Sequence, residues 1–206
     1  MAATLATEGS FRNSGQRCTA VKRILVEEAV LEEFTAKFVA KAGEFIVGDP
    51  ADEATRIGTV IDESAAIVLE ERVAEAVAAG AEVLLGGNRN GAQLEPTIIA
   101  NVPRDAEMVC EESFGPLAPI MPVRDLDDAL ALANASDFGL SSGVVTNDMA
   151  AAIRVVKELK TGAVNVNQVP GFRMESSPFG GVKDSGLGIK EGVIEAMKFM
   201  TTTKTF

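Results

Sequence analysis

The sequence has no histidine, no tryptophan, no tyrosine and only two cysteines among its 206 residues. Without an imidazole, the chain cannot form a Cys-His or Ser-His dyad, and the commonest zinc sites lose their nitrogen ligand. Two cysteines cannot build a disulfide framework or a four-thiolate site, so we expect no metal and a reducing, cytoplasmic compartment. A nucleophilic cysteine would need activation by something other than an imidazole of this chain.

Several nucleotide-binding and metal-binding motifs are also missing. There is no GxxxxGK[ST], no HExxH and no paired CxxC, and "GLGIKEG" at 186–192 misses GxGxxG because its last glycine comes one residue late. No signal peptide is visible, and no apolar run is long enough to span a membrane. The net charge of −11 argues against nucleic-acid binding, which needs a basic face. A small anionic substrate stays possible, because a pair of arginines can dominate one pocket.

What is present predicts an α/β fold. The chain is 47% hydrophobic and 24% charged, as expected for a globular domain with a core. Strand-like segments alternate with helical ones, which favours βαβ units and a mostly parallel sheet with flanking helices. In the helix at 64–79, we expect Ile67, Val73 and Val77 on the buried side. We expect helices at 2–11, 30–39, 64–79, 125–133 and 148–159, and strands at 21–26, 81–87, 96–102, 118–123, 142–146 and 163–167.

The last part of the chain differs in composition from the rest. From Pro170 onward, "PGFRMESSPFGGVKDSGLG" is rich in glycine, proline and serine, and a long irregular segment inside a compact domain is often functional. The ending "MKFMTTTKTF" predicts a terminal strand over 198–206. We therefore expect one domain over 1–197, followed by a strand whose unpaired edge would mediate association.

The two cysteines lie in different settings. Cys18 belongs to "NSGQRCTAVKRILV" at 13–26, between a glycine-containing turn and a strand-like run. A free cysteine is more often a small buried residue than a nucleophile, and reactivity depends on its pKa and exposure, so the residues alone leave both interpretations open. For Cys110, which has no motif of its own, we expect a small buried residue.

Three stretches together carry a resemblance: "NSGQRCTA" at 13–20, "EESFGPL" at 111–117 and "SPFGGVKDSGLGIKEG" at 177–192. In this order and spacing, they resemble the C-terminal, catalytic part of the aldehyde dehydrogenase superfamily, from about Thr4 to Phe206. In that family a cysteine thiolate attacks the aldehyde, hydride passes to NAD or NADP, and water releases the acid. The resemblance implies that Cys18 is the nucleophile, with its own N–H helping to hold the oxyanion. It also implies that Glu112 binds the nicotinamide ribose and that Phe114 lines the nicotinamide pocket.

Arginines near these motifs suggest the substrate class. "GQRCTAVKR" together with "VPGFRMESSPFGGVKDSGLG" looks most like phosphonoacetaldehyde dehydrogenases, with non-phosphorylating glyceraldehyde-3-phosphate and semialdehyde dehydrogenases as related alternatives. Arg17 and Arg173 are the candidate substrate-binding residues, because guanidinium groups bind phosphonate, phosphate or carboxylate in a two-pronged way. The plainer interpretations are an internal salt bridge for Arg17 and a surface charge for Arg173.

Complete members of the resembled family are longer than this chain. They carry an N-terminal nucleotide-binding domain, an oxyanion-hole asparagine and a general-base glutamate in an "ELGG"-like segment, and Glu8 in "ATEGS" does not match that motif. We therefore expect a truncated domain that is inactive alone, from a parent that forms a homodimer or tetramer. The preference between NAD and NADP stays open. The alternatives are a non-catalytic assembly module and a cofactor-free cysteine hydrolase, against which the missing histidine counts.

Overall fold

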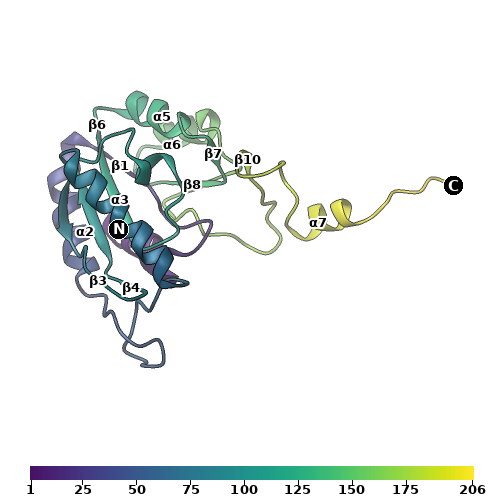
Figure 1. The fold of residues 1–206 in the computed structure, drawn as a ribbon. Helices are drawn as coiled ribbons and strands as arrows, with labels where there is room; N and C mark the ends of the chain where they lie inside the picture. The colour runs from purple at the N-terminus through teal and green to yellow at the C-terminus, as the bar shows by residue number, and fades with distance from the viewer. The chain divides into compact units, whose positions relative to one another are not determined.

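The structure is a computed structural model that describes residues 1–206. The chain forms two compact units, Met1–Ala133 and Asn134–Phe206, which are described separately. The first unit has an α/β fold with a mostly parallel sheet, as the sequence predicts (Figure 1). Its elements are α1 (Ala2–Phe11), η1 (Arg12–Gly15), β1 (Ile24–Glu27), η2 (Glu28–Val30), α2 (Leu31–Ala42), α3 (Glu63–Ala78), β2 (Glu82–Leu85), β3 (Arg89–Asn90), β4 (Gln93–Leu94), β5 (Thr97–Ala100), α4 (Glu107–Cys110), β6 (Leu117–Val123) and α5 (Leu126–Asn134).

Strand β6 is the central element of the four-stranded sheet, whose order is β1-β6-β5-β2. It pairs in parallel with β1 on one side and with β5 on the other, while β2 runs antiparallel to β5. Because side chains alternate along a strand, Leu117 and Met121 of β6 enter one buried cluster, while Ala118 and Ile120 enter the other. The strand is therefore apolar on both faces, as expected for a sheet covered by helices on both sides.

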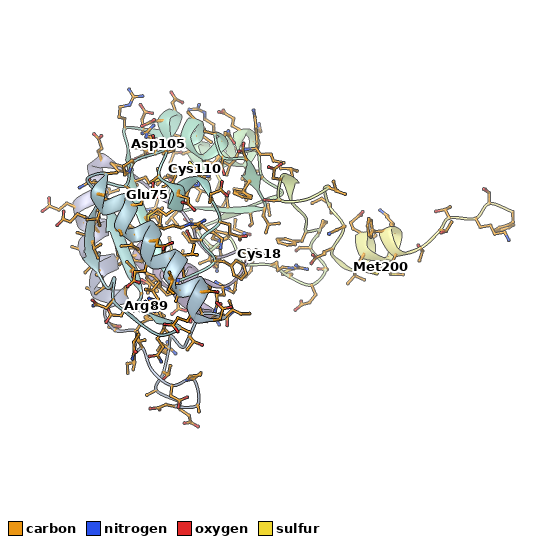
Figure 2. The ribbon with its side chains drawn as sticks, viewed as in Figure 1. Cys18, Glu75, Arg89, Asp105, Cys110 and Met200 are labelled. Carbon is orange, nitrogen blue, oxygen red and sulfur yellow. The ribbon has the colours of Figure 1, made fainter.

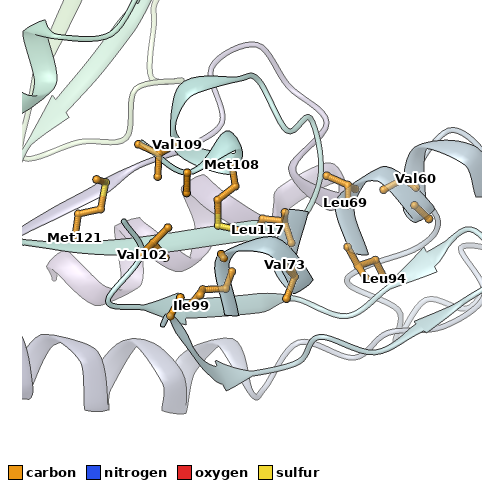
Figure 3. Close-up of a cluster of buried hydrophobic side chains, with 14 of the residues drawn as sticks. Val60, Leu69, Val73, Leu94, Ile99, Val102, Met108, Val109, Leu117 and Met121 are labelled. Atoms are coloured by element: carbon orange, nitrogen blue, oxygen red, sulfur yellow. The ribbon is translucent and has the colours of Figure 1, made fainter. Parts of the chain in front are cut away.

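Two helical layers cover the sheet. Helices α1 and α2 pack on one face, where Phe11 and Phe38 stack with their ring centroids 5.9 Å apart. Helices α3, α4 and α5 contribute to the cluster on the other face, which Figure 3 shows in close-up. The side of α3 that is buried differs from our expectation, since Ile67 and Val77 are exposed. The buried residues of α3 are Ala66, Leu69, Val73 and Ala76.

The reason for this difference is the composition of α3. Apolar residues lie around most of the circumference of this helix. Helical spacing alone therefore does not decide which of its faces is buried. The start of the helix was predictable, because the carboxylate of Asp62 accepts a hydrogen bond of 2.8 Å from the N–H of Ala65 and so caps the first turn.

The second unit is smaller and has short strands. Parallel strands β8 and β9 pair residue by residue, and antiparallel β7 pairs with β10. Asp148 caps α6 by accepting from the N–H groups of Ala150 and Ala151, as the sequence predicts. No helix in the structure combines the length and the apolar character that crossing a bilayer requires. The elements are β7 (Phe138–Gly139), β8 (Ser141–Val144), α6 (Met149–Glu158), β9 (Ala163–Val166), β10 (Val182–Lys183) and α7 (Val193–Met200).

The end of the chain differs from the terminal strand that we expected over 198–206. Residues 198–200 form the last turn of α7, and residues 201–206 have no helix or strand (Figure 1). A strand is stable only when its N–H and C=O groups are paired, and the single chain pairs nothing with this segment. The apolar spacing of Ile194, Met197 and Met200 instead fits a helix.

Candidate active site

Two loops that are far apart in the sequence meet because of the strand order. The turn that carries Cys18 precedes β1, and the segment 111–115 precedes β6. Since β1 and β6 are parallel neighbours, their amino ends lie at the same edge of the sheet. A small hollow lined by residues of both loops, including Ala20, Lys22, Ser113 and Phe114, confirms that they adjoin.

The turn before Cys18 has an unusual backbone. Asn13, Ser14 and Gly15 all adopt the left-handed region, with φ values of 56°, 53° and 69°. Asparagine and glycine tolerate this conformation, but serine rarely adopts it, and such strain is common at functional sites. The turn then closes with a 3.0 Å hydrogen bond from the N–H of Ala20 to the carbonyl of Arg17, which leaves Cys18 exposed at its centre (Figure 2).

Hydrogen bonds to helix α1 hold this turn in place. The carbonyl of Gly9 accepts one hydrogen bond from the N–H of Val21, at 3.0 Å, and another from the guanidinium of Arg17, at 3.3 Å. The Arg17 side chain therefore reaches back to the helix, and the salt bridge considered for it is replaced by a bond to a backbone carbonyl. Its buried Nε has no hydrogen-bond partner, which leaves one donor unsatisfied.

The segment 111–115 is held from helix α3. The side chain of Arg72, which is only 12% exposed, donates to the carboxylate of Glu107 through two of its nitrogens. Its third nitrogen donates to the carbonyl of Glu112 at 2.9 Å and to Ser113 Oγ at 3.2 Å. Arg72 thus fixes the backbone from which Glu112 projects. Phe114 follows in a left-handed conformation with φ 48°, which is rare for a bulky residue.

The two loops touch at a pair of glycines. A Cβ added to Gly15 would lie 2.1 Å from the carbonyl oxygen of Gly115, so any other residue there would have to displace this backbone. Glycine is therefore required at position 15 both by this close approach and by its positive φ. The contact sets the distance between the turn of Cys18 and the segment that carries Glu112 and Phe114.

Lys22 lies between the loops. Its ammonium group donates to the carbonyl of Arg17 at 3.2 Å and forms an ion pair with Glu112 Oε1 at 3.4 Å. It also lies 5.0 Å from the ring centroid of Phe114, within the range of a cation–π contact. Burial lowers the pKa of Lys22 below the usual 10.5, while the negative charges of Glu112 and Cys18 act in the opposite direction.

A larger cavity, of about 470 Å³, lies at the other edge of the same sheet. It is lined by residues that follow the carboxyl ends of β1, β5 and β6, among them Glu28, Asn101 and Arg124. Because the three strands are parallel, this edge is the one opposite to Cys18. The cavity is therefore separate from the candidate active site.

Cys110 is a correction to the prediction. We expected a buried residue, but its side chain is exposed at the end of α4, with its sulfur 3.8 Å from the carbonyl of Arg104 (Figure 2). The reason is that α4 is only four residues long, and Met108 and Val109 occupy its buried side. Exposure by itself therefore does not distinguish the two cysteines, whereas the strained turn before Cys18 does.

Arg173 belongs to the second unit and has partners of its own there. It donates to Glu191 at 2.9 Å, and its guanidinium stacks on Phe179 at 4.5 Å from the ring centroid. Its side chain is 36% exposed. Arg173 is therefore an exposed charge with partners of its own, and it links the irregular segment to residues near "GIKEG".

The structure brings Cys18, Arg17, Glu112 and Phe114 together in the first unit, while Arg173 is placed in the second. Sequence reasoning missed Lys22 and Arg72. Lys22 had a weak signal, because it follows Cys18 by four residues in the same short segment. Arg72 had none, because it comes from a helix whose contact with the segment 111–115 depends on the fold.

Comparison with known proteins identifies the family of this chain. A sequence model of the Aldehyde dehydrogenase family matches residues 1–206, and the chain belongs to this family. It is 40% identical over 205 residues to the lactaldehyde dehydrogenase of Methanococcus vannielii, a match that covers 100% of this chain and 44% of the relative. The chain therefore spans less than half the length of this curated relative.

Two solved structures share the fold. Aldehyde dehydrogenase 21 from Physcomitrella patens, in complex with the reaction product succinate, has a TM-score of 0.93 and 39% identity, over 97% of this chain and 41% of that one. The glyceraldehyde-3-phosphate dehydrogenase GapN from Methanocaldococcus jannaschii, complexed with NADP, has a TM-score of 0.92 and 38% identity, over 96% of this chain and 43% of that one. The α/β architecture is thus that of aldehyde dehydrogenases.

Proposed function

We propose that this chain is the cysteine-bearing catalytic part of an NAD(P)-dependent aldehyde dehydrogenase, with Cys18 as the nucleophile. The observation that supports this most is an exposed cysteine on a strained, anchored turn beside the segment with Glu112 and Phe114. An exposed thiol near positive charge is the setting that a reactive cysteine needs. Cys110 is also exposed, but it lies at the end of α4, and by resemblance the nucleophile is Cys18.

Cys18 forms and breaks the covalent bond in the proposed reaction. The Cys18 thiolate attacks the aldehyde carbon and forms a carbon–sulfur bond, while the carbonyl electrons move to oxygen and the backbone N–H of Cys18 helps to hold the oxyanion. A nicotinamide cofactor bound beside it supplies the acceptor for the hydride that leaves this carbon. Water then displaces the sulfur from the resulting thioester, which releases the carboxylate and restores the thiolate.

The residues at the loop fit such a cofactor. The side chain of Glu112 is 44% exposed and can accept from two vicinal ribose hydroxyls, although one of its oxygens already contacts Lys22. The ring of Phe114 is 45% exposed and offers an apolar wall. The NADP bound in the GapN structure supports a nicotinamide dinucleotide as the class of cofactor, and the choice between NAD and NADP stays open.

We further propose an aldehyde with an anionic tail, phosphonoacetaldehyde among them. Arg17 and Arg173 are the proposed binding residues, and the guanidinium of Arg173 is partly exposed. The solved relatives support an anionic tail, since one holds succinate and the other is named for glyceraldehyde 3-phosphate. The relative named for lactaldehyde makes an uncharged hydroxyaldehyde the second candidate.

Serine substitutions test the nucleophile. In an enzyme that joins this chain to a nucleotide-binding domain, Cys18→Ser abolishes aldehyde-dependent NAD(P)H formation, because a hydroxyl at neutral pH is a far weaker nucleophile than a thiolate. The matched control, Cys110→Ser, keeps most of the activity. Turnover by the first variant at the level of the second would refute the assignment.

A further inference from the structure

We propose that Lys22 is a positioning residue: it ties the Glu112 carboxylate and the Phe114 ring to the turn of Cys18, and it gives this turn a positive charge. The proposal rests on the function proposed above for Cys18 and Glu112. It concerns a residue to which the resemblance assigned no role, although it lies within "GQRCTAVKR".

The geometry of one ammonium group carries the first half of the proposal. Lys22 follows Cys18 by four residues and donates to the carbonyl of Arg17, so its position is fixed relative to the sulfur-bearing turn. The same nitrogen contacts Glu112 Oε1 and lies over the ring of Phe114. One side chain thus joins residues about ninety positions apart in the sequence.

The consequence for Glu112 is a fixed carboxylate. Arg72 holds the backbone carbonyl of this residue, and Lys22 holds one oxygen of its side chain, so the residue is restrained at both ends. A carboxylate has two oxygens with several acceptor directions, and the contact with Lys22 uses one of them. The other oxygen stays available for hydroxyl groups of a ligand.

The consequence for Cys18 is electrostatic. The side chain of Lys22 is only 25% exposed, so solvent screens its charge less than that of a surface lysine. Its ammonium group is hydrogen-bonded to the carbonyl of Arg17, the residue before Cys18, so a positive charge lies at the turn that carries the thiol. Glu112 partly neutralises this cation, which makes the charge at the turn depend on both residues.

The test uses alkylation of the chain itself, in a Cys110→Ser background so that only Cys18 reacts. The thiolate displaces iodide either from iodoacetate, which is anionic, or from iodoacetamide, which is neutral, and the ratio of the two rates reports the charge near the sulfur. Lys22→Met lowers this ratio by on the order of three-fold, because one partly screened cation is lost. Lys22→Arg keeps the ratio near that of the unchanged chain.

Two further variants complete the comparison. Glu112→Gln raises the ratio, since Lys22 loses the carboxylate that neutralises it. Lys37→Met, which removes an exposed lysine paired with Glu33 on α2, leaves it unchanged. A general loss of packing would change the rates with both reagents together and not their ratio. If the ratio stays constant in both the Lys22→Met and the Glu112→Gln chains, the electrostatic role is refuted.

Hydrogen exchange tests the positioning role separately. In the Lys22→Met chain, amide exchange of residues 111–115 becomes faster while exchange in β5 and β6 stays the same. Unchanged exchange at 111–115, or equally faster exchange throughout the unit, overturns this role. Neither measurement needs an aldehyde or a cofactor. A negative result in either measurement would therefore refute the role of Lys22 without affecting the proposed function. If instead the Cys18→Ser test contradicts the proposed function, the alkylation and exchange results can still be interpreted.

Discussion

Asp128 shows how a single buried charge is stabilised. The residue is 8% exposed, and its carboxylate accepts two hydrogen bonds from the guanidinium of Arg104, at 3.0 and 2.9 Å, and one from the backbone N–H of Arg124. These hydrogen bonds lower the pKa of Asp128 from 3.8 to about 2, and those from Arg104 make the largest contribution. The charged form is therefore the one that the fold stabilises.

This pKa predicts how the stability of an Asp128→Asn chain depends on pH. A carboxylate with a depressed pKa stabilises the fold above its unfolded value and loses this contribution as the pH falls through its folded value. The variant should unfold at a lower urea concentration than the unchanged chain at pH 5 and above. The difference should shrink below pH 4 and disappear only below about pH 2, as urea titrations at several pH values would show. A difference that does not change with pH would contradict the ion pair as its cause.

Arg173 permits a test of substrate class in the complete enzyme. A charge-assisted hydrogen bond contributes about 1.5–3 kcal/mol, so Arg173→Ala should lower kcat/KM for phosphonoacetaldehyde by roughly one to two powers of ten. An uncharged aldehyde of similar length should be affected much less. Glu191→Gln is the matched control, because it removes the partner of Arg173 and leaves the guanidinium free for an anion. Equal losses with both aldehydes would mean that Arg173 only supports its loop.

At the scale of elements, the contact between the turn of Cys18 and the segment 111–115 can be tested with two alanines. Gly15 and Gly91 have similar backbones, with φ values of 69° and 59°, but a Cβ at Gly91 would meet nothing within 4 Å. Gly91→Ala should cost only the left-handed conformation, roughly 1–2 kcal/mol. Gly15→Ala should cost about 1–3 kcal/mol more, because the added carbon must displace Gly115. Equal urea midpoints for the Gly15→Ala and Gly91→Ala chains would show that separating the two loops does not lower the free energy of unfolding.

The elements were predictable from the sequence to a useful extent, and their arrangement was not. Apolar periodicity locates most of the longer helices and strands. Nothing local shows that β6 lies between β1 and β5, because strand order depends on contacts distant in sequence. Cys18, Glu112 and Phe114 were found through motifs, whereas Arg72 could be found only after the fold placed α3 beside the segment 111–115.

For the whole molecule, the exposed C-terminal segment predicts self-association. The side chains of Ile194, Met197, Phe199 and Phe206 are all more than half exposed, which is unfavourable in water. We expect light scattering to give a larger mass for the full chain than for a chain without residues 198–206. Thr203→Ala, in the same segment, should leave the mass unchanged. Equal masses for the full and shortened chains would count against association through this segment, and against the non-catalytic assembly module considered as an alternative function.

The separation into two units has a consequence for protein engineering. Every contact described for the turn of Cys18, from the Gly9 carbonyl to Lys22, Glu112 and the glycine pair, is made within Met1–Ala133. Arg173 makes its own contacts with Glu191 and Phe179 within Asn134–Phe206. A chimera that takes residues 134–206 from a relative with another substrate would therefore replace the Arg173 cluster and preserve each of these contacts around the nucleophile. One crossover near residue 134 would then exchange the Arg173 part of the proposed substrate site without changing the residues around Cys18.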